Sequence, residues 1–156
     1  MIYYSSLFIT EKPKNGLIKI HGGTLFDYYF VIDKKWNGKQ RTKFIIQQYL
    51  EGLLNLIEKY ENDEQIKIKG TSYIINKRTA EKIGFKVDKI DALQKITLMY
   101  NYFNILISNS IAKKQLSFPN LSRTKTFYTD IGQLVERKKY IENLNKSLKN
   151  TLPNNN

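Results

Sequence analysis

The chain has 156 residues, which is enough for one domain around one hydrophobic core. It contains no cysteine, which excludes disulfides and thiolate chemistry. Its single histidine argues against a metal site of the zinc type, since such sites use His and Cys. The formal net charge of +12 suits nucleic acid, an anionic membrane surface or an anionic ligand as a partner.

The excess of positive charge has a second explanation. Of the 26 basic residues, 22 are Lys and 4 are Arg, and Lys, Ile and Asn are all abundant, as in proteins from AT-rich genomes. Arg is the residue preferred for binding phosphates and bases through two parallel hydrogen bonds. We therefore keep nucleic-acid binding as an alternative rather than as the leading function.

The first part of the chain predicts three strands. Residues 2–9 (IYYSSLFI) and 25–33 (LFDYYFVID) are rich in aromatic and β-branched side chains, and residues 17–21 (LIKIH) alternate in part. Short connections between these segments predict an antiparallel meander. Because no basic region precedes the first apolar stretch, it is not predicted to be a secretion signal, and we expect a cytoplasmic protein.

The pattern then changes to that of helical crossovers. Residues 39–60 place apolar side chains on one face of a helix, namely Ile46, Tyr49, Leu50, Leu53, Leu54, Ile57 and Tyr60. Residues 65–75 are predicted as a strand, residues 76–84 as a short helix and residues 85–90 as another strand. A strand–helix–strand–helix–strand order predicts crossover connections on a mixed sheet.

The most apolar segment, residues 96–112, contains 17 residues without a charge. This is short of the about 20 residues that span a membrane, so we expect no transmembrane segment. We predict a core helix that starts near Asp91 and is largely covered by the sheet. A helix lying in a membrane interface is the alternative, and a surface that binds a partner protein is a third interpretation.

The last third predicts a strand and a final helix. A loop and a strand lie between residues 116 and 130, and Asp130 caps an amphipathic helix. The fold class expected from all elements is α+β, with a mixed, mostly antiparallel sheet and about four helices. A single domain covers residues 1–149, and residues 150–156 are predicted as a disordered tail.

The order of elements between residues 26 and 90 resembles the GNAT-type N-acyltransferases. A strand ending near Ile32 is followed by a turn with a glycine, an amphipathic helix, a strand, a short helix ending in Gly84-Phe85 and another strand. The match covers under half of the chain. The resemblance implies acetyl-coenzyme A or another acyl-coenzyme A as co-substrate. It also implies direct transfer of the acyl group to an amine of a small molecule or peptide.

In that family a loop of the form R/Q-x-x-G-x-G/A opens the helix, and its backbone N–H groups hold the coenzyme pyrophosphate. The resemblance implies that this role falls to GKQRTK, which is Gly38, Lys39, Gln40, Arg41, Thr42 and Lys43. Gln40 and Thr42 stand where the family prefers Gly or Ala. The tyrosine that often serves the family as general acid is replaced here by Ala80, so the motif is degenerate.

The strand before this loop lines the acceptor site in the family. This makes His21, Asp27, Tyr28 and Tyr29 the titratable candidates, of which His21, Asp27 and Tyr29 are taken as catalytic. Strand alternation predicts Asp27 and Tyr29 on one face and Tyr28 on the other. His21 also begins the string HGGT, which resembles the oxyanion-hole strings of some lipases. The chain contains no G-x-S-x-G, so a tight glycine turn is the alternative for HGGT.

A second function class rests on the basic and aromatic residues after Ala112. These can neutralise and stack on a single nucleic-acid strand, and they are Lys113, Lys114, Phe118, Arg123, Lys125, Phe127 and Tyr128. The ordinary alternative places the aromatics in the core and the charges in solvent. The leading prediction is thus an N-acyltransferase-like protein. The alternatives are a non-enzymatic basic module for nucleic acid or an anionic surface, and a partner-binding protein.

Overall fold

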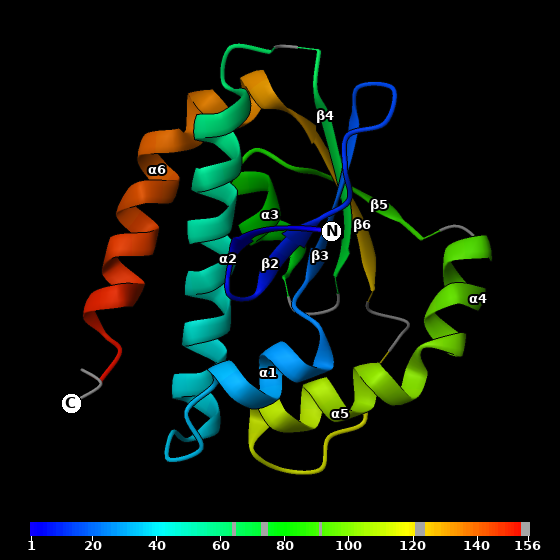
Figure 1. Cartoon of the computed structure of the whole chain (residues 1–156), viewed down its shortest axis with the longest axis vertical. Helices are drawn as coiled ribbons and strands as arrows, with labels where there is room; N and C mark the ends of the chain where they lie inside the picture. The colour runs from blue at the N-terminus through cyan, green and yellow to red at the C-terminus, as the bar shows by residue number, and fades with distance from the viewer. Residues whose placement is uncertain (64, 73–74, 91, 121–123, 154–156) are drawn as a thin grey trace.

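A six-stranded mixed sheet runs through the middle of the molecule, with the strand order β1-β2-β3-β4-β6-β5. The structure is a computed structural model and describes residues 1–63, 65–72, 75–90, 92–120 and 124–153. Helices α2 and α6 lie side by side against the sheet, and α1 and α5 lie together at one end of it (Figure 1). Most neighbouring strands are antiparallel, which confirms the predicted fold class.

The predicted first strand, residues 2–9, is wrong because it folds back on itself. It forms the hairpin of β1 (Ile2–Ser5) and β2 (Phe8–Thr10), which pair antiparallel. Two contacts with one residue of α2 fix the turn: the Ser5 hydroxyl donates to the Gln48 carbonyl at 2.7 Å, and the Ser6 N–H donates to the Gln48 side chain at 3.0 Å. On its other side β2 pairs antiparallel with β3 (Leu17–Gly22), so a meander forms from shorter strands than predicted.

The predicted strand over residues 25–33 is also wrong, because most of it is the helix α1 (Leu25–Val31). A capping box starts this helix: the Thr24 side chain accepts from the Asp27 N–H, and the Asp27 carboxylate accepts from the Thr24 N–H at 2.6 Å. The helix buries Tyr28 on its inner side. Local capping therefore outweighs the strand preference of the aromatic side chains.

Helix α2 (Gly38–Tyr60) confirms the helix predicted from periodicity. Its buried face includes Leu53, Leu56 and Ile57, which are 0–3 % exposed and belong to the main core. Helix α6 (Ile131–Asn150) packs beside it and is capped by Asp130, as predicted. The two helices cover the same face of the sheet.

The other predicted strands and the short helix are present. They are β4 (Lys67–Ser72), α3 (Lys77–Lys82), β5 (Lys86–Lys89) and β6 (Lys125–Asp130). Strand β4 runs parallel to β3, and β6 lies between β4 and β5 and is antiparallel to both. Residues 73–74, at the end of the predicted fourth strand, lie outside the described residues. The β3–α1–α2–β4 path is a crossover between parallel strands, but it starts from β3 and not from the strand predicted over residues 25–33.

The charge-free segment differs most from its prediction. It forms two helices, α4 (Ala92–Tyr100) and α5 (Tyr102–Lys113), which meet at Asn101, and the sheet does not cover them. Tyr100 is 91 % exposed and Phe103 is 75 % exposed. The predicted cap Asp91 lies outside the described residues. Within the described ranges, no helix is both long enough and apolar enough to cross a bilayer.

The described residues form six helices rather than about four, because α1 was predicted as a strand and the charge-free segment is divided. The main core lies between the sheet and the helices α2, α3 and α6, and a smaller cluster joins α1, α2 and α5. At the C-terminus, α6 extends to Asn150, and the Thr151 N–H donates to the Leu148 carbonyl at 3.0 Å. Residues 154–156 of the predicted tail lie outside the described residues.

Candidate functional site

The two central parallel strands separate at their C-terminal ends. Pairing between β3 and β4 runs from Leu17 opposite Lys67 to Ile20 opposite Gly70. Beyond that point His21 and Gly22 pair with β2, whereas Thr71 and Ser72 pair with β6. Each strand thus follows its outer neighbour, and the two strand ends are not paired with one another.

An apolar cavity of about 130 Å³ lies at this separation, between the sheet and the helices α2 and α3. We call it the inner cavity. The ends of both strands contribute to it, and its walls are mainly aliphatic and aromatic, including Ile46, Leu50, Leu53, Ala80, Ile83 and Phe127. Such a cavity favours an apolar ligand group of modest size.

A second, wider hollow of about 570 Å³ opens next to it, between the strand ends and the helices α1 and α5. We call it the outer hollow. Its lining is more polar, with Thr24 at the start of α1 and Asn104 and Ser108 on α5. The inner cavity and the outer hollow share Gly22, Tyr49, Thr71 and Ser72 among their lining residues. A ligand with an apolar end and a polar remainder can therefore occupy both.

Two tyrosine hydroxyls stand at this junction. The hydroxyls of Tyr28 on α1 and Tyr49 on α2 are 2.7 Å apart and hydrogen-bonded. Burial raises the pKa of Tyr49, and the hydrogen bond with Tyr28 opposes part of that rise. Gly22 passes so close to the Tyr49 hydroxyl that a Cβ at this position would collide with it. Tyr49 therefore stays protonated near neutral pH, and its hydroxyl lies where it can donate a hydrogen bond to a ligand at the junction.

Sequence reasoning names Tyr28 as a titratable candidate but places it on a strand. It assigns Tyr49 to the apolar face of a helix, so it does not bring the two hydroxyls together. The available signal was the capping box that begins at Thr24, since a helix start there turns Tyr28 towards α2.

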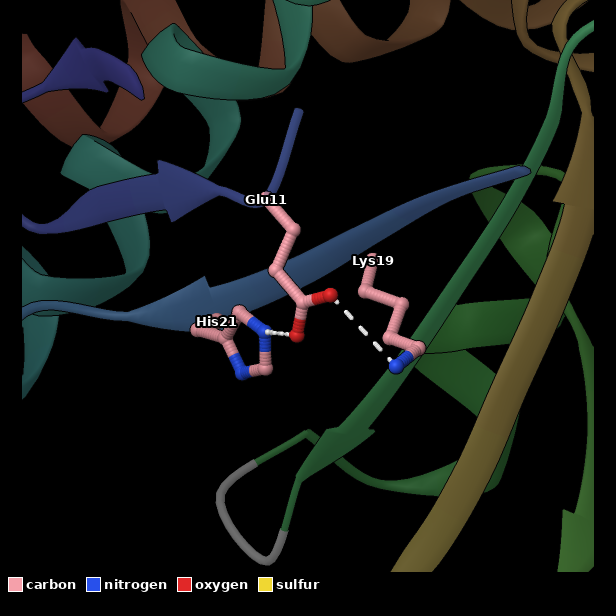
Figure 2. Close-up of polar contacts among 3 residues, drawn as sticks. All are labelled: Glu11, Lys19 and His21. Atoms are coloured by element: carbon pink, nitrogen blue, oxygen red, sulfur yellow. Dashed lines mark hydrogen bonds and ion pairs between the residues drawn. The ribbon is translucent and has the colours of Figure 1, made fainter. Parts of the chain in front are cut away.

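The predicted catalytic residue His21 lies on the open face of the sheet, away from α2 (Figure 2). Its Nε2 is 3.1 Å from a Glu11 carboxylate oxygen, and Lys19 Nζ is 3.4 Å from the other oxygen. Burial alone would raise the pKa of Glu11, but the hydrogen bonds from His21 and Lys19 outweigh it and lower this pKa. His21 belongs to the strand end that lines the inner cavity, but its ring contacts Glu11 on the other face of the sheet.

The other two catalytic candidates lie on α1, so their predicted sharing of one strand face is wrong. The Asp27 carboxylate accepts from the Thr24 N–H, the Thr24 hydroxyl and the Tyr3 hydroxyl at 2.6–3.1 Å. Tyr29 is half exposed, and Lys34 Nζ lies 4.4 Å above its ring centre. Neither residue lines the inner cavity or the outer hollow. The structure therefore does not bring His21, Asp27 and Tyr29 together.

The predicted phosphate loop is a capped helix start. The Asn37 side chain accepts from the N–H groups of Lys39 and Gln40 at 3.0 and 3.1 Å, and the Gln40 side chain accepts from the Asn37 N–H at 2.9 Å. Gly38 permits a close approach of α5, because a Cβ there would lie 2.6 Å from the Lys113 carbonyl oxygen. Two of the N–H groups that would hold a pyrophosphate thus already have a partner within the chain.

Part of the predicted loop does gather around an open basin. Gly38, Lys39, Thr42 and Lys43 line it together with Lys113 from the end of α5. The three lysine side chains are exposed, so the basin is positive.

Arg41 turns inward instead. It is 7 % exposed and donates to the carbonyls of Trp36, Ile111 and Lys34 at 3.0, 2.8 and 2.9 Å. Arg41 therefore fixes the loop before α2 to the end of α5, and its guanidinium is occupied.

A second candidate surface is a row of side chains across the open face of the sheet. Lys19 lies opposite Lys69, Lys69 opposite Tyr128, and Tyr128 opposite Lys86 on four neighbouring strands. We call this the lysine–tyrosine row. Side chains alternate along each strand, so the neighbouring Phe127 faces the core, where it is 4 % exposed. Of the basic and aromatic residues predicted after Ala112, Tyr128 is therefore the one in this row, and Arg123 lies outside the described residues.

Within the described residues, no group of three or more His, Cys, Asp or Glu side chains is placed to hold a metal ion. Comparisons with models of known protein families, with curated proteins and with solved structures found no match to this chain.

Proposed function

We propose that the protein is an acyl-coenzyme A-dependent N-acyltransferase with a GNAT-like arrangement, acting in the cytoplasm on an amine of a small molecule or peptide. The observation behind this proposal is the separation of β3 and β4 at an apolar cavity. In open sheets with parallel strands, ligands bind beyond the carboxyl ends of strands whose connections diverge. The inner cavity would hold the acyl chain.

The length of α2 supports a place for the remainder of the coenzyme. The junction residue Tyr49 is eleven residues after Gly38, which corresponds to about 16 Å along a helix. An extended pantetheine arm is of comparable length. A thioester at the tyrosine pair would then place the pyrophosphate near the positive basin. There the side chains of Lys39, Lys43 and Lys113 would neutralise it, in place of the backbone N–H groups that Asn37 occupies.

The chemistry at the junction is direct transfer. The neutral amine attacks the thioester carbonyl carbon, the new C–N bond forms, and the C–S bond breaks. A tyrosine hydroxyl of the Tyr28–Tyr49 pair donates its proton to the leaving sulfur, and the proton lost by the amine restores that hydroxyl. The ring of His21 is on the opposite face with Glu11, so the proposal assigns it no proton transfer. The amine must therefore arrive unprotonated.

Thermal denaturation with acyl-coenzyme A tests the coenzyme site. The melting temperature should rise with the logarithm of the ligand's excess over its Kd. Substituting Lys39→Gln, Lys43→Gln and Lys113→Gln together should reduce that rise. A charge-matched control, Lys139→Gln with Lys146→Gln and Lys149→Gln on exposed positions of α6, should leave it unchanged. No rise at millimolar ligand, or equal rises in both triple variants, would contradict the proposed coenzyme site.

The acid role has its own test. With an amine acceptor that the protein acylates, Tyr49→Phe should lower kcat while the protein still binds the coenzyme thioester. The release of free thiol measures the reaction. Tyr140→Phe on the exposed side of α6 is the control. An unchanged kcat in Tyr49→Phe would remove this residue from the mechanism.

The lysine–tyrosine row favours a second candidate function, the binding of single-stranded nucleic acid. Lysines on both sides of an exposed tyrosine ring can neutralise phosphates while a base stacks on the ring. Lys19 is partly neutralised by Glu11, whereas Lys86 is exposed at the edge of the sheet.

Nucleic-acid binding would weaken steeply with salt, since each neutralised phosphate releases counterions. Tyr128→Ala should cost about 1–3 kcal/mol of binding free energy, and Tyr140→Ala should cost none. Phe127→Ala is unsuitable, because Phe127 is part of the core. Binding that does not depend on salt would contradict this second candidate function. An equal loss of binding free energy in Tyr128→Ala and Tyr140→Ala would contradict it too.

A further inference from the structure

The helices α4 and α5 expose several large apolar side chains. We call five of them, three on α4 and two on α5, the apolar stripe: Ile96, Met99, Tyr100, Phe103 and Ile107. Their exposed fractions run from 44 % to 91 %. Globular proteins expose single apolar residues often, but a group of this size marks a surface that contacts something.

The two helices that bear the apolar stripe project from the body of the molecule. Along α4, the side chains from Lys95 to Tyr100 are exposed except that of Leu98, which is half-buried. Helix α5 packs on α1 and α2 through its last turns, where Asn109 and Ala112 are buried. In Figure 1, α5 runs along the lower end of the molecule and α4 turns upward from it on the right, on the opposite side of the view from α6. The stripe is therefore on a projecting element and not inside a groove.

Within the segment that carries the stripe, the charges are all of one sign. From residue 92 to residue 129 the sequence contains no Asp or Glu, and Lys95 and Lys113–Lys114 bracket the charge-free segment. None of these three lysines takes part in an ion pair within the described residues. A second copy of the chain would bring the same positive charge to the contact, on a molecule whose net charge is already +12. A self-interface is thus opposed by charge repulsion.

We propose that the apolar stripe docks the protein onto a phospholipid bilayer that contains anionic lipids. An apolar helical face bordered by lysines is the pattern of helices that lie in the membrane interface. The stripe would enter the region between headgroups and acyl chains. Lys95 and Lys114 would extend their ammonium groups to the anionic headgroups. This proposal is independent of the acyl-transfer function, because none of the five stripe residues lines the inner cavity or the outer hollow.

The polar residues of the segment fit the same arrangement. Asn109 is buried on the body side, where its amide donates to the Ser117 carbonyl at 2.6 Å. Asn101, at the elbow, donates to the Thr97 carbonyl at 3.0 Å, so its amide has a partner within the helix. The amides of Asn101 and Asn109 thus bond within the protein, while the side chains of the apolar stripe are exposed.

Flotation of the full-length protein with vesicles tests the proposal. Vesicles of phosphatidylcholine with about 30 mol % phosphatidylserine should carry the protein at low salt, and vesicles of phosphatidylcholine alone should carry much less. Tyr100→Ser with Phe103→Ser should weaken binding about tenfold or more for each side chain lost. Lys95→Gln with Lys114→Gln should weaken binding about 25-fold at low salt, and this effect should vanish in about 1 M salt. Tyr140→Ser on α6 is the matched control and should bind as the unchanged protein does.

A fluorescent probe locates the contact. Tyr100→Trp should show quenching by brominated phosphatidylcholine in mixed anionic vesicles, and Tyr140→Trp should not. Trp36 is buried and gives the same background in both. The proposal is overturned if anionic vesicles do not carry the protein at low salt, or if the serine substitutions leave flotation unchanged. It is also overturned if sedimentation shows a dimer that the serine substitutions dissociate, since the stripe then joins two copies.

Discussion

Helix α2 and the α4–α5 pair are both rich in apolar residues, yet they are buried to opposite extents. In α2 the residues Leu56 and Ile57 are fully buried, whereas Met99 and Tyr100 of α4 are among the most exposed large side chains of the chain. Helix α2 has charged residues on the side away from the core, and α4–α5 have none between Lys95 and Lys113. A charged face fixes which side of a helix stays in water, and the opposite side is then available for the core. The lack of charge does not by itself indicate burial.

The comparison is sharpest for two apolar side chains of similar size. Ile68 on β4 is 0 % exposed, and Met99 is 68 % exposed. Ile68→Ala should lower the free energy of unfolding by about 2–5 kcal/mol, because it removes buried methyl groups and leaves a cavity. Met99→Ala should change it by less than about 0.5 kcal/mol. Urea denaturation measures both. Equal losses would mean that α4 is packed against the body in solution.

Arg41 joins the two regions, so its loss tests whether they fold as one unit. Arg41→Met removes the donor to three carbonyls, one of which belongs to Ile111 on α5. We expect the free energy of unfolding to fall by about 1.5–3 kcal/mol, because methionine has no donor for the three carbonyls that the charged guanidinium bonds. Amide hydrogen exchange in α5 should speed up more than in α6.

The control for Arg41 is Lys43→Met, two residues later on the exposed side of the same helix. It should leave both stability and exchange nearly unchanged. Unchanged exchange in α5 of Arg41→Met would show that the α1–α5 contacts hold α5 without the arginine.

The smallest effect is expected at Tyr49, where the inner cavity meets the outer hollow. Its pKa is raised in the folded protein, chiefly by burial. A raised pKa means that the folded state holds this proton more tightly than the unfolded state. The stability it contributes is complete below the unfolded pKa of about 10 and decreases as the pH rises through the folded pKa. Tyr49→Phe should therefore flatten the loss of stability above about pH 10. Urea denaturation at several pH values measures the slope, and an unchanged slope would contradict the raised pKa.

Local patterns in the sequence predicted most elements of the body. The periodicity of α2, the Asp130 cap of α6 and the short helix α3 depend on residues close together in the chain, and all three are confirmed. The segment that forms α1 is rich in residues that favour strands, and it also begins with a capping box. The strand prediction rests on the composition and takes no account of the capping box.

The candidate site was harder to predict from the sequence. It depends on which strand each end of β3 and β4 follows, and the two strands are separated by the whole of α1 and α2. Pairing over such a distance is decided by tertiary packing and not by local preference. The predicted residues therefore fell near the site without forming it: His21 on the opposite face, Asp27 in a helix cap and Arg41 inside the protein.

The inner position of β6 in the sheet has a consequence for folding during synthesis. This strand lies between β4 and β5 in the sheet but is made after both, so Ile68 must await its partner Thr129, which comes much later in the sequence. While the ribosome still holds the last part of the chain, β4 and β5 each have an edge of unpaired N–H and C=O groups, and unpaired edges are templates for aggregation. A ribosome that stalls before residue 125 would release a chain with an incomplete sheet. Pairing of β6 thus covers the facing edges of β4 and β5, and only β1 and β5 remain as edge strands of the finished sheet.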